Sequence, residues 1–377
     1  MHVATIVGPG TDGLRVGIVG CGMVSRNHIE AFHAASGVEV VAVSDVDLER
    51  AQAQAHKHGI PFACGSLEEL LAHGVDIVSV CTPHPTHEEV VLAAARAGAH
   101  VLCEKPIAVD LAAAQRMVRV CRESGVTLGV LFQRRFWPAA QRIRRAIDDG
   151  TLGTPVLGHV SVQLHRNREY YAKDAWRGTW GTGGGGVLMT QAVHYIDLVQ
   201  WFMGRVTSVQ GAMGTYKHGD VIEVEDSATA VLTFESGAMA TVNASTVVTP
   251  ALGIDIRVTG STGATVGLRE FPEGTEGVNH LWASGSAIES APMPQGVNPN
   301  ADLAQINGRL VPFHVLQVAD FVEAVREGRA PAVTGEDAFA ALGIVLAVYE
   351  SARSGRPVDP AELLAEEDAA LTGEGAR

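Results

Sequence analysis

Residues 15–25, RVGIVGCGMVS, decide the fold of this chain. The apolar run RVGIV is typical of a buried β-strand, and it passes directly into Gly20 and Gly22. Gly20 allows a tight turn, and Gly22 lets the backbone approach a phosphate group at the N-terminus of the next helix. The turn is completed by Met23, Val24 and Ser25. Ser25 stands where a third glycine would complete the pattern, so the motif alone is weak.

Outward from this stretch, short apolar runs alternate with amphipathic segments. The runs predict strands at 15–19, 39–44, 76–81, 100–103 and 127–131. The segments between them predict helices at 28–35, 48–58, 67–73, 87–97 and 111–123. Near-continuous apolar strands separated by helices indicate a parallel sheet covered on both faces. The sequence therefore predicts an α/β fold with an N-terminal Rossmann domain.

An acidic side chain ends the second predicted strand. Asp45 lies 25 positions after Gly20 (45 − 20), near the spacing at which a carboxylate binds the ribose of a dinucleotide. That carboxylate would repel a 2′-phosphate, and residues 46–48 contain no Arg or Lys. We therefore predict NAD as the cofactor and disfavour NADP. The alternative is that Asp45 only caps the helix that begins near Leu48.

The next strand ends carry further polar side chains. Thr82, His84 and His87 follow the strand at 76–81, and we predict that this loop lines the cofactor or the substrate. No third ligand stands at a suitable spacing, so we predict no metal site. Glu104 and Lys105 end the strand at 100–103. A lysine buried there can exchange a proton with a substrate hydroxyl.

Four glycines, residues 183–186, precede a helical pattern that runs to Met203. On that helix Thr190 and His194 share one face, as do Gln191 and Tyr195. Consecutive glycines are hard to explain by packing alone, because each costs backbone entropy. We interpret them as a close approach of the chain, with the nicotinamide end of the cofactor as the candidate partner.

Aromatic and basic residues gather ahead of the glycines. The cluster contains Arg166, Arg168, Tyr170, Tyr171, Trp176 and Arg177. Arginine forks suit carboxylates or phosphates and aromatic faces suit sugar rings, so we predict substrate contacts at Tyr171, Trp176 and Arg177. Arg134 and Arg135, after the strand at 127–131, are added as candidates, Arg135 foremost. Residues 271–310 read as a long excursion, rich in Gly, Pro, Asn and Ser.

The overall composition and charge of the chain exclude several classes of protein. A net charge of −14 over 377 residues disfavours nucleic-acid binding. No apolar stretch is long enough to span a bilayer, and residues 1–13 do not resemble a secretory signal. Five scattered cysteines predict reduced thiols. We therefore expect a cytoplasmic protein with a small-molecule substrate, no nucleic-acid partner and no membrane contact.

Several of these motifs together resemble the Gfo/Idh/MocA oxidoreductase family. They are the GCGxxS turn, Asp45, Glu104-Lys105-Pro106, the glycine run that leads to His194 and Asp197, and a helix at 339–354 followed by Gly-Arg-Pro-Val. The likeness covers roughly residues 14–358. It implies a C-terminal α/β domain on an open, mainly antiparallel sheet, to which the runs 206–211, 227–234 and 238–244 are suited. It also implies homodimers or homotetramers joined through that sheet.

The resemblance implies that Lys105 is the catalytic lysine and His194 the active-site histidine. One position departs from the family pattern. Many members have aspartate four residues before the histidine, where this chain has Thr190. An aspartate that would position the imidazole is therefore missing, and Thr190 and Gln191 are left as substrate contacts. Family members that act on nucleotide-linked or aminated sugars sometimes have a glutamine at the position of Gln191 and a stretch similar to Trp-Arg-Gly-Thr-Trp at 176–180, so the resemblance favours a sugar over an inositol.

These observations predict four segments: an extension (1–13), a Rossmann domain (14–136), a substrate-binding and oligomerisation domain (137–358), and an acidic tail (359–377). Within the third, residues 334–358 are expected to pack back on the first domain. The predicted function is NAD-dependent hydride transfer from a secondary hydroxyl of a sugar or sugar derivative, such as C3 of a pyranose. Inositol oxidation, glycoside cleavage through transient oxidation, and a non-catalytic NAD(H) sensor are the alternatives. The sequence leaves open the substrate and which of Lys105 and His194 is the base.

Overall fold

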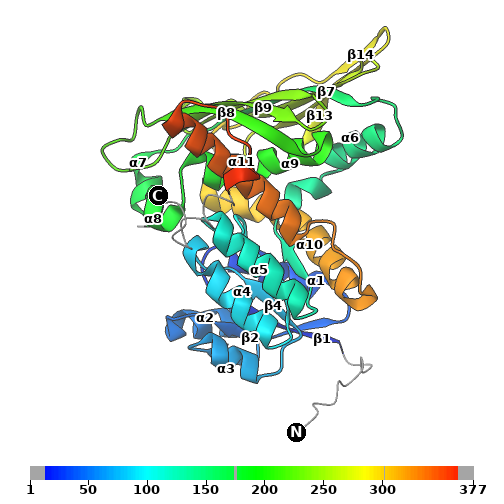
Figure 1. The fold of residues 1–377 in the computed structure, drawn as a ribbon. Coiled ribbons are helices and arrows are strands. Elements are labelled where there is room, and N and C mark those ends of the chain that lie inside the picture. Colours follow the sequence, from blue (N-terminus) through cyan, green and yellow to red (C-terminus); the bar gives the residue numbers. More distant parts are fainter. Residues whose placement is uncertain (1–12, 174–175, 301, 364–377) are drawn as a thin grey trace, which may run out of the picture.

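The computed structural model describes residues 13–173, 176–300 and 302–363. Two sheets dominate it, a six-stranded one in the first part of the chain and an eight-stranded one in the second. They lie one above the other, with helices between them (Figure 1). The predicted N-terminal extension and most of the predicted acidic tail lie outside the described residues.

The six-stranded sheet confirms the Rossmann prediction. Its strands are β1 (Leu14–Val19), β2 (Val38–Ser44), β3 (Phe62–Cys64), β4 (Ile77–Val80), β5 (His100–Cys103) and β6 (Leu128–Val130). They are parallel and follow the order β3-β2-β1-β4-β5-β6. The helices are α1 (Ser25–Ala34), α2 (Leu48–His58), α3 (Leu67–Ala72), α4 (His87–Arg96) and α5 (Leu111–Glu123). β3 was not among the predicted runs, because three residues after a proline carry little periodic signal.

The eight-stranded sheet confirms the predicted open, mainly antiparallel sheet. Its strands are β7 (Pro155–Gln163), β8 (Val206–Gly214), β9 (Ser227–Phe234), β10 (Met239–Ser245), β11 (Gly253–Gly260), β12 (Thr265–Glu270), β13 (Val278–Ser284) and β14 (Ala287–Ser290). Only β7 and β10 pair in parallel. The predicted excursion at residues 271–310 contains β13 and β14, which extend the sheet at one edge, and the start of a long helix.

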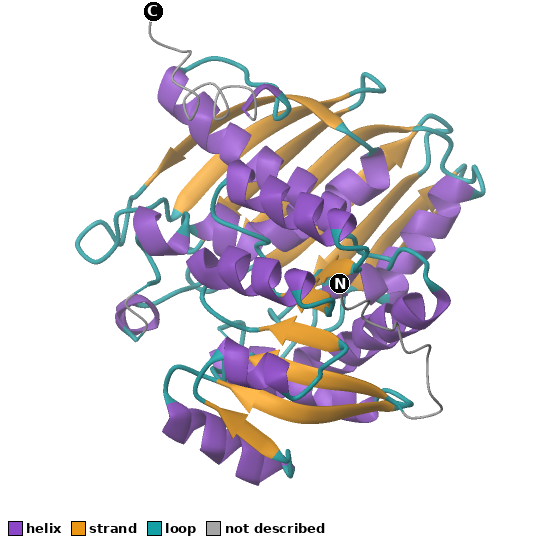
Figure 2. Cartoon of the chain, turned by 60° about the horizontal axis from the view of Figure 1, so that its bottom comes forward, coloured by secondary structure: helices purple, strands orange, loops and turns teal. Residues whose placement is uncertain are grey.

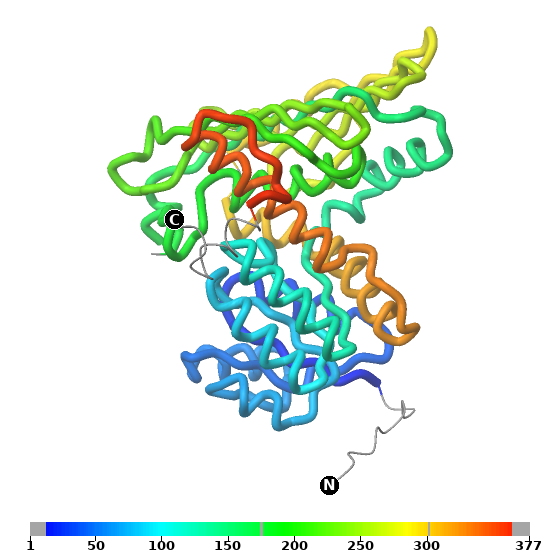
Figure 3. The backbone as a smooth tube through the Cα atoms, in the orientation of Figure 1, coloured from blue at the N-terminus to red at the C-terminus, as the bar shows by residue number. Residues whose placement is uncertain are grey.

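Helices from the second half of the chain fill the space between the sheets. They are α6 (Pro138–Asp148), α9 (Val193–Met203), α10 (Leu303–Glu327) and α11 (Gly335–Ser354). α11 packs on β8 and α9 on one side and on α5 on the other, and α10 packs along α1. Figure 2 shows helices lying across one face of the large sheet, and the tube in Figure 3 follows α10 back to the first domain. The two halves of the chain are therefore joined by packed helices.

Candidate active site

One cavity of about 870 Å³ lies where the two halves of the chain meet. The carboxyl ends of the parallel strands form one wall, which is the usual position of a ligand in such sheets. The opposite wall comes from the second half of the chain. We call the part lined by Gly20, Gly22 and Asp45 the dinucleotide end. The part lined by the second half of the chain, together with Lys105 and Arg134, is the substrate end.

The glycine turn at the dinucleotide end has the geometry that the sequence predicts. Gly20 has a φ of 91°, and a side chain there would lie 2.7 Å from the Cys81 backbone. A Cβ added to Gly22 would meet no atom within 4 Å, so the space in front of this residue is open to a ligand. Ser25 fits at the position of the third glycine: it is fully buried, and its hydroxyl donates a hydrogen bond to the Gly22 carbonyl (2.7 Å). Met23 and Val24 line the cavity beside them.

Asp45 is buried at the end of β2 and lines the cavity. Its carboxylate accepts backbone hydrogen bonds from Cys21 (2.8 Å) and Asp47 (2.9 Å). A carboxylate has about four acceptor positions, so others are left for ribose hydroxyls. The alternative that Asp45 caps α2 is wrong, because Asp47 is the capping residue and accepts from the Arg50 backbone. The Arg50 side chain lies 3.5 Å from Asp45 and also lines the cavity.

The loop after β4 contributes Thr82 and His84 to the cavity, but not His87. The buried Thr82 hydroxyl has no hydrogen-bond partner among the described residues, which leaves it available to a ligand. Burial lowers the pKa of His84 to about 3, and its ring packs edge-on to Trp176. His87 lies behind the loop, where its ring contacts the carbonyl oxygens of Thr82 (3.0 Å) and Pro106 (3.0 Å).

Lys105 crosses from the first half of the chain to the second. Its ammonium donates to the backbone carbonyl of Thr190 (2.9 Å), and both residues line the cavity. Burial lowers the pKa of Lys105 to about 8, although the neighbouring Glu104 carboxylate opposes the shift. A lysine with such a pKa can both accept and donate a proton near neutral pH.

Glu104 is held from behind by two histidines. His28 lies 2.9 Å from the Glu104 carboxylate and His314 of α10 lies 3.9 Å from it. Burial alone would raise the pKa of Glu104, but the hydrogen bond with His28 and the nearby ring of His314 hold it well below its usual range. Among the residues that the structure describes, these three side chains form the one group with metal-ligand spacing, within 4.8 Å. His84 and His87 are not part of it.

His194 lies 6% exposed on the cavity wall, and its Nδ1 has no hydrogen-bond partner in the described chain. Burial, reinforced by the positive charges of Arg134 and Lys105, holds the pKa of His194 well below its usual range. The imidazole is therefore neutral at pH 7. His194 is the second residue of α9, which directly follows the five-residue π-helix η3 (Leu188–Ala192). The expected regular helix from the glycines to Met203 thus starts with a wider turn, a common feature of functional sites.

The four glycines before η3 approach protein, not cofactor. A Cβ on Gly186 would lie 1.8 Å from the Glu225 carbonyl oxygen, and one on Gly185 would lie 2.1 Å from the Tyr349 hydroxyl. The interpretation of these glycines as the nicotinamide contact is therefore wrong. Their function is to let the chain pass Glu225, whose carboxylate accepts from the backbone of Gly186 (2.8 Å) and Leu188 (2.9 Å). These bonds anchor the start of η3.

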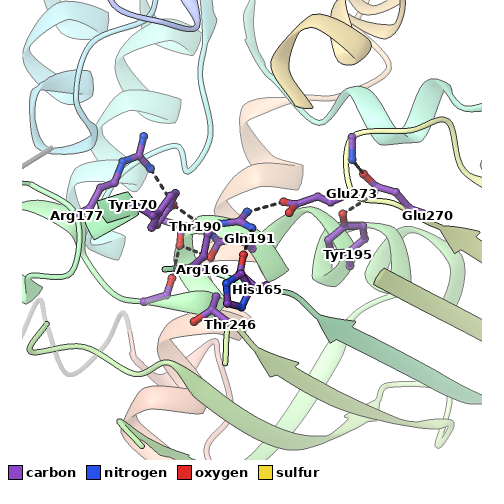
Figure 4. A network of polar contacts seen from close by, with 12 residues as sticks. His165, Arg166, Tyr170, Arg177, Thr190, Gln191, Tyr195, Thr246, Glu270 and Glu273 are labelled. Carbon is purple, nitrogen blue, oxygen red and sulfur yellow. Dashed lines mark hydrogen bonds and ion pairs between the residues drawn. The ribbon is translucent and has the colours of Figure 1, made fainter. Parts of the chain in front are cut away.

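The aromatic–basic cluster divides between the cavity and the core. Tyr170, Trp176 and Arg177 line the cavity. The Tyr170 hydroxyl accepts from Arg177 (2.9 Å) and from the Gln191 amide (2.9 Å), as Figure 4 shows. Tyr171 instead faces away and bonds Thr246 (3.0 Å). Arg168 is exposed and pairs with Asp220.

A similar division separates the neighbours Arg134 and Arg135. Arg134 lines the cavity and forms a two-bond ion pair with Glu270 (3.1 and 3.2 Å). Arg135 does not line it, because its guanidinium is bound by Asp197 (2.6 and 2.8 Å) and lies 3.3 Å from Asp337. The predicted substrate contact at Arg135 therefore does not fit its position, and Arg134 takes its place in the site.

Several cavity residues were not singled out by the sequence at all, and Glu273 and His314 are among them. Glu273, three residues after Glu270, lines the substrate end and pairs with the buried Arg166 (2.7 Å). His314 reaches the cavity from α10. The only signal for Glu273 is the pair of acidic residues around Pro272 in an otherwise Gly- and Asn-rich stretch.

Comparisons with known proteins cover both halves of the chain. Residues 14–132 match a family described as oxidoreductases with an NAD-binding Rossmann fold, and residues 144–359 match its C-terminal alpha/beta domain. A D-apiose dehydrogenase of Paraburkholderia graminis is 31% identical over 93% of this chain and 90% of its own length. A myo-inositol 2-dehydrogenase of Thermotoga maritima is 28% identical over 93% and 100%.

A solved structure supports the same match. The WlbA dehydrogenase from Bordetella pertussis, in complex with NADH and UDP-GlcNAcA, superposes with a TM-score of 0.78. It is 31% identical, and the alignment covers 92% of this chain and 98% of that one. Both halves of the present chain therefore have counterparts in a single relative of known structure.

Proposed function

The chain belongs to the Gfo/Idh/MocA oxidoreductase family, and on that premise we propose that it is an NAD-dependent dehydrogenase that oxidises a secondary hydroxyl of a sugar or cyclic polyol. The observation that carries the proposal is the single cavity. It joins a glycine turn and an acidic ribose position to a buried lysine and a buried neutral histidine. Relatives named for apiose and inositol oxidation support the substrate class.

The dinucleotide end fits NAD by its own chemistry. The open space before Gly22 suits a pyrophosphate, the Asp45 carboxylate suits two ribose hydroxyls, and the unpaired Thr82 hydroxyl suits a polar group between them. Bound NAD supplies the acceptor for the two electrons that leave the substrate carbon. The protein residues have to bind the sugar, exclude water and move one proton.

Lys105 and His194 are the candidates for that proton. Both line the substrate end, and both are buried with lowered pKa values. His194 is neutral at pH 7, whereas Lys105, with a pKa of about 8, can accept the proton of a substrate hydroxyl only in the fraction that has lost its own. The Thr190 carbonyl fixes the Lys105 ammonium, which sets the direction from which a hydroxyl can reach it. Arg134, Arg166, Tyr170 and Gln191 surround the remaining space, with Trp176 and Arg177 on the side of Tyr170.

The test is a screen of the purified protein with NAD, and separately NADP, against inositols, free pentoses and hexoses, glycosides and sugar nucleotides. Formation of reduced nicotinamide with one class supports the dehydrogenase and identifies the substrate. Release of an aglycone without accumulating NADH would instead indicate cleavage through transient oxidation. If NAD binds but no compound in the panel binds or reacts, the sensor alternative gains and the proposal fails.

The same proposal includes a homo-oligomer formed through the open face of the eight-stranded sheet. The helices α9 and α11 cover one face of this sheet, and the other is bare in Figure 1. On the bare face Leu157 and Met239 lie opposite each other in register, and both are about half exposed at 52%. Val231 of β9 is exposed nearby at 47%. Light scattering after size exclusion should give a dimer or tetramer, and charged substitutions at Leu157 and Met239 should yield monomers.

The compartment is likewise a proposal. All five cysteines are buried and unpaired, which supports a reducing compartment such as the cytoplasm. No helix in the described ranges is long and apolar enough to cross a membrane. Fractionation of cells that express the full chain would test the assignment.

A further inference from the structure

Glu273 is the acidic residue of the substrate end that neither the sequence motifs nor the proposed mechanism uses. It follows β12 on the loop that leads to β13, and its side chain is buried on the cavity wall. Oε1 accepts from Arg166 Nη2 (2.7 Å). Oε2 forms no hydrogen bond with the residues that the structure describes. In Figure 4 the carboxylate extends toward Arg166, which lies between it and Gln191.

The charges around Glu273 are already balanced. Arg166 is neutralised by Glu273 itself, and Arg134 is neutralised by the two-bond pair with Glu270. An anionic ligand bound near Glu273 would be repelled by its carboxylate, and the charges of Arg134 and Arg166 are already neutralised. Arg177 stands apart, stacked over the rings of Tyr170 and Trp176. The two arginines beside Glu273 are therefore already paired with carboxylates.

The unsatisfied atoms in this corner include donors as well as acceptors. Arg134 Nη1 and Arg166 Nε are buried N–H donors without a partner in the described chain, and the Glu273 carboxylate is an acceptor beside them. A hydroxyl both donates and accepts, so adjacent hydroxyls on a ring can satisfy both kinds of atom. A substrate carboxylate can only accept, and next to Glu273 it would add repulsion.

We propose that Glu273 is a specificity-determining residue that binds adjacent hydroxyls of a neutral sugar or cyclic polyol and excludes acidic sugars. This inference rests on the proposed function and narrows its substrate class. The carboxylate takes the hydroxyl protons as hydrogen bonds, while Arg134 donates to a hydroxyl oxygen. Neutral rings then fill every unpaired position in the corner, and uronates leave the carboxylate opposed by a like charge.

The experiment compares neutral sugars and inositols with the matching uronates in wild-type protein, Glu273→Gln and Glu276→Gln. Glu276 is exposed on the same loop and does not line the cavity, so its substitution matches the change of charge without touching the site. For Glu273→Gln we expect kcat/KM on the best neutral substrate to fall about 10- to 100-fold, the loss for a hydrogen bond to a charged group. Its ratio of neutral to acidic turnover should fall further, while Glu276→Gln behaves as wild type.

A second measurement keeps the outcome independent of folding and of catalysis. NADH affinity and melting temperature, with and without each sugar, show whether Glu273→Gln is folded and which ligands bind. If neutral sugars react but the neutral-to-acidic ratio of Glu273→Gln equals that of wild type, or if wild type prefers the uronate, the assignment of Glu273 is overturned and the dehydrogenase stands. If no sugar binds or reacts with wild-type protein, the proposed function fails and Glu273 fails with it.

Discussion

The two ends of the cavity are built from contacts of different reach. At the dinucleotide end Asp45 is bound by residues 2 and 24 positions away, and Ser25 by one 3 positions away. At the substrate end the Lys105–Thr190 contact spans 85 positions and the Arg134–Glu270 pair spans 136. Backbone turns and nearby residues shape the first site, whereas side chains brought together by the tertiary fold shape the second. The two ends should therefore respond differently to substitution.

The largest effect is expected at the substrate end, where Lys105 joins the halves. Lys105→Ala should lower kcat by about 10²- to 10⁴-fold, the usual contribution of a proton-transfer group, because His194 alone cannot replace the lost ammonium. NADH binding should change little, since the hydrogen bonds of Asp45 and Ser25 at the dinucleotide end do not involve Lys105. Steady-state kinetics and a fluorescence titration with NADH measure the two. The exposed Lys217 provides the control, and near-normal turnover of Lys105→Ala would remove Lys105 from the mechanism.

Arg135→Met should separate stability from substrate binding. It leaves the fully buried Asp197 carboxylate without its main partner, a change that usually costs about 3–5 kcal/mol of unfolding free energy. Since Arg135 does not line the cavity, KM of the folded enzyme should stay unchanged. Denaturant unfolding measures the loss of stability, and steady-state kinetics well below the melting temperature measure KM. Arg145→Met, at an exposed position of the next helix, should be neutral, and a large rise in KM for Arg135→Met would return this residue to the site.

The neighbours Arg134 and Arg135 show what the sequence alone cannot predict. The strand, turn and helix at 14–34 and the position of Asp45 were predictable, because local periodicity and spacing determine them. The sequence could not predict that Arg134 rather than Arg135, and Tyr170 rather than Tyr171, lines the cavity. One member of each pair faces the cavity, and which one depends on partners such as Glu270 and Thr246 far along the chain. Only the tertiary fold supplies that information.

Glu273 is the clearest case of this limit. It lies in a stretch that reads as an irregular excursion, and its partner Arg166 is 107 positions away. The π-helix before His194 is similar, since it depends on Glu225 accepting the backbone of residues 186 and 188. The glycine run indicated that another part of the molecule lies close to the chain there, but it did not identify Glu225 as that part. Patterns in sequence predict a local shape, whereas the identity of a distant partner has to come from the fold.

The pH profile distinguishes the two candidate bases without any substitution. The pKa of Lys105 is lowered to about 8, mainly by burial, so the neutral form that can accept a proton is present above pH 8 and is lost below it. If Lys105 is the base, kcat/KM for oxidation should fall about tenfold for each pH unit below about 8. The pKa of His194 is held well below its usual range, again mainly by burial, so a His194 base would leave the rate flat down to acidic pH. If the pH profile of kcat/KM still falls below about pH 8 in His194→Gln, Lys105 is the base.

The smallest effect is expected at the dinucleotide end, where backbone atoms supply much of the binding. Asp45→Ala removes the acceptor for the ribose hydroxyls and the charge that repels a 2′-phosphate, and it leaves Arg50 beside the vacated position. The ratio of kcat/KM for NAD to that for NADP should fall by about 10- to 100-fold, the loss for hydrogen bonds to one charged group. Glu49→Ala is the matched control, because Glu49 is exposed on the first turn of α2 and does not line the cavity, so its loss removes a negative charge without changing the ratio. An unchanged ratio in Asp45→Ala would mean that the backbone alone selects the cofactor, and the contrast between the two ends would then be sharper than their contacts imply.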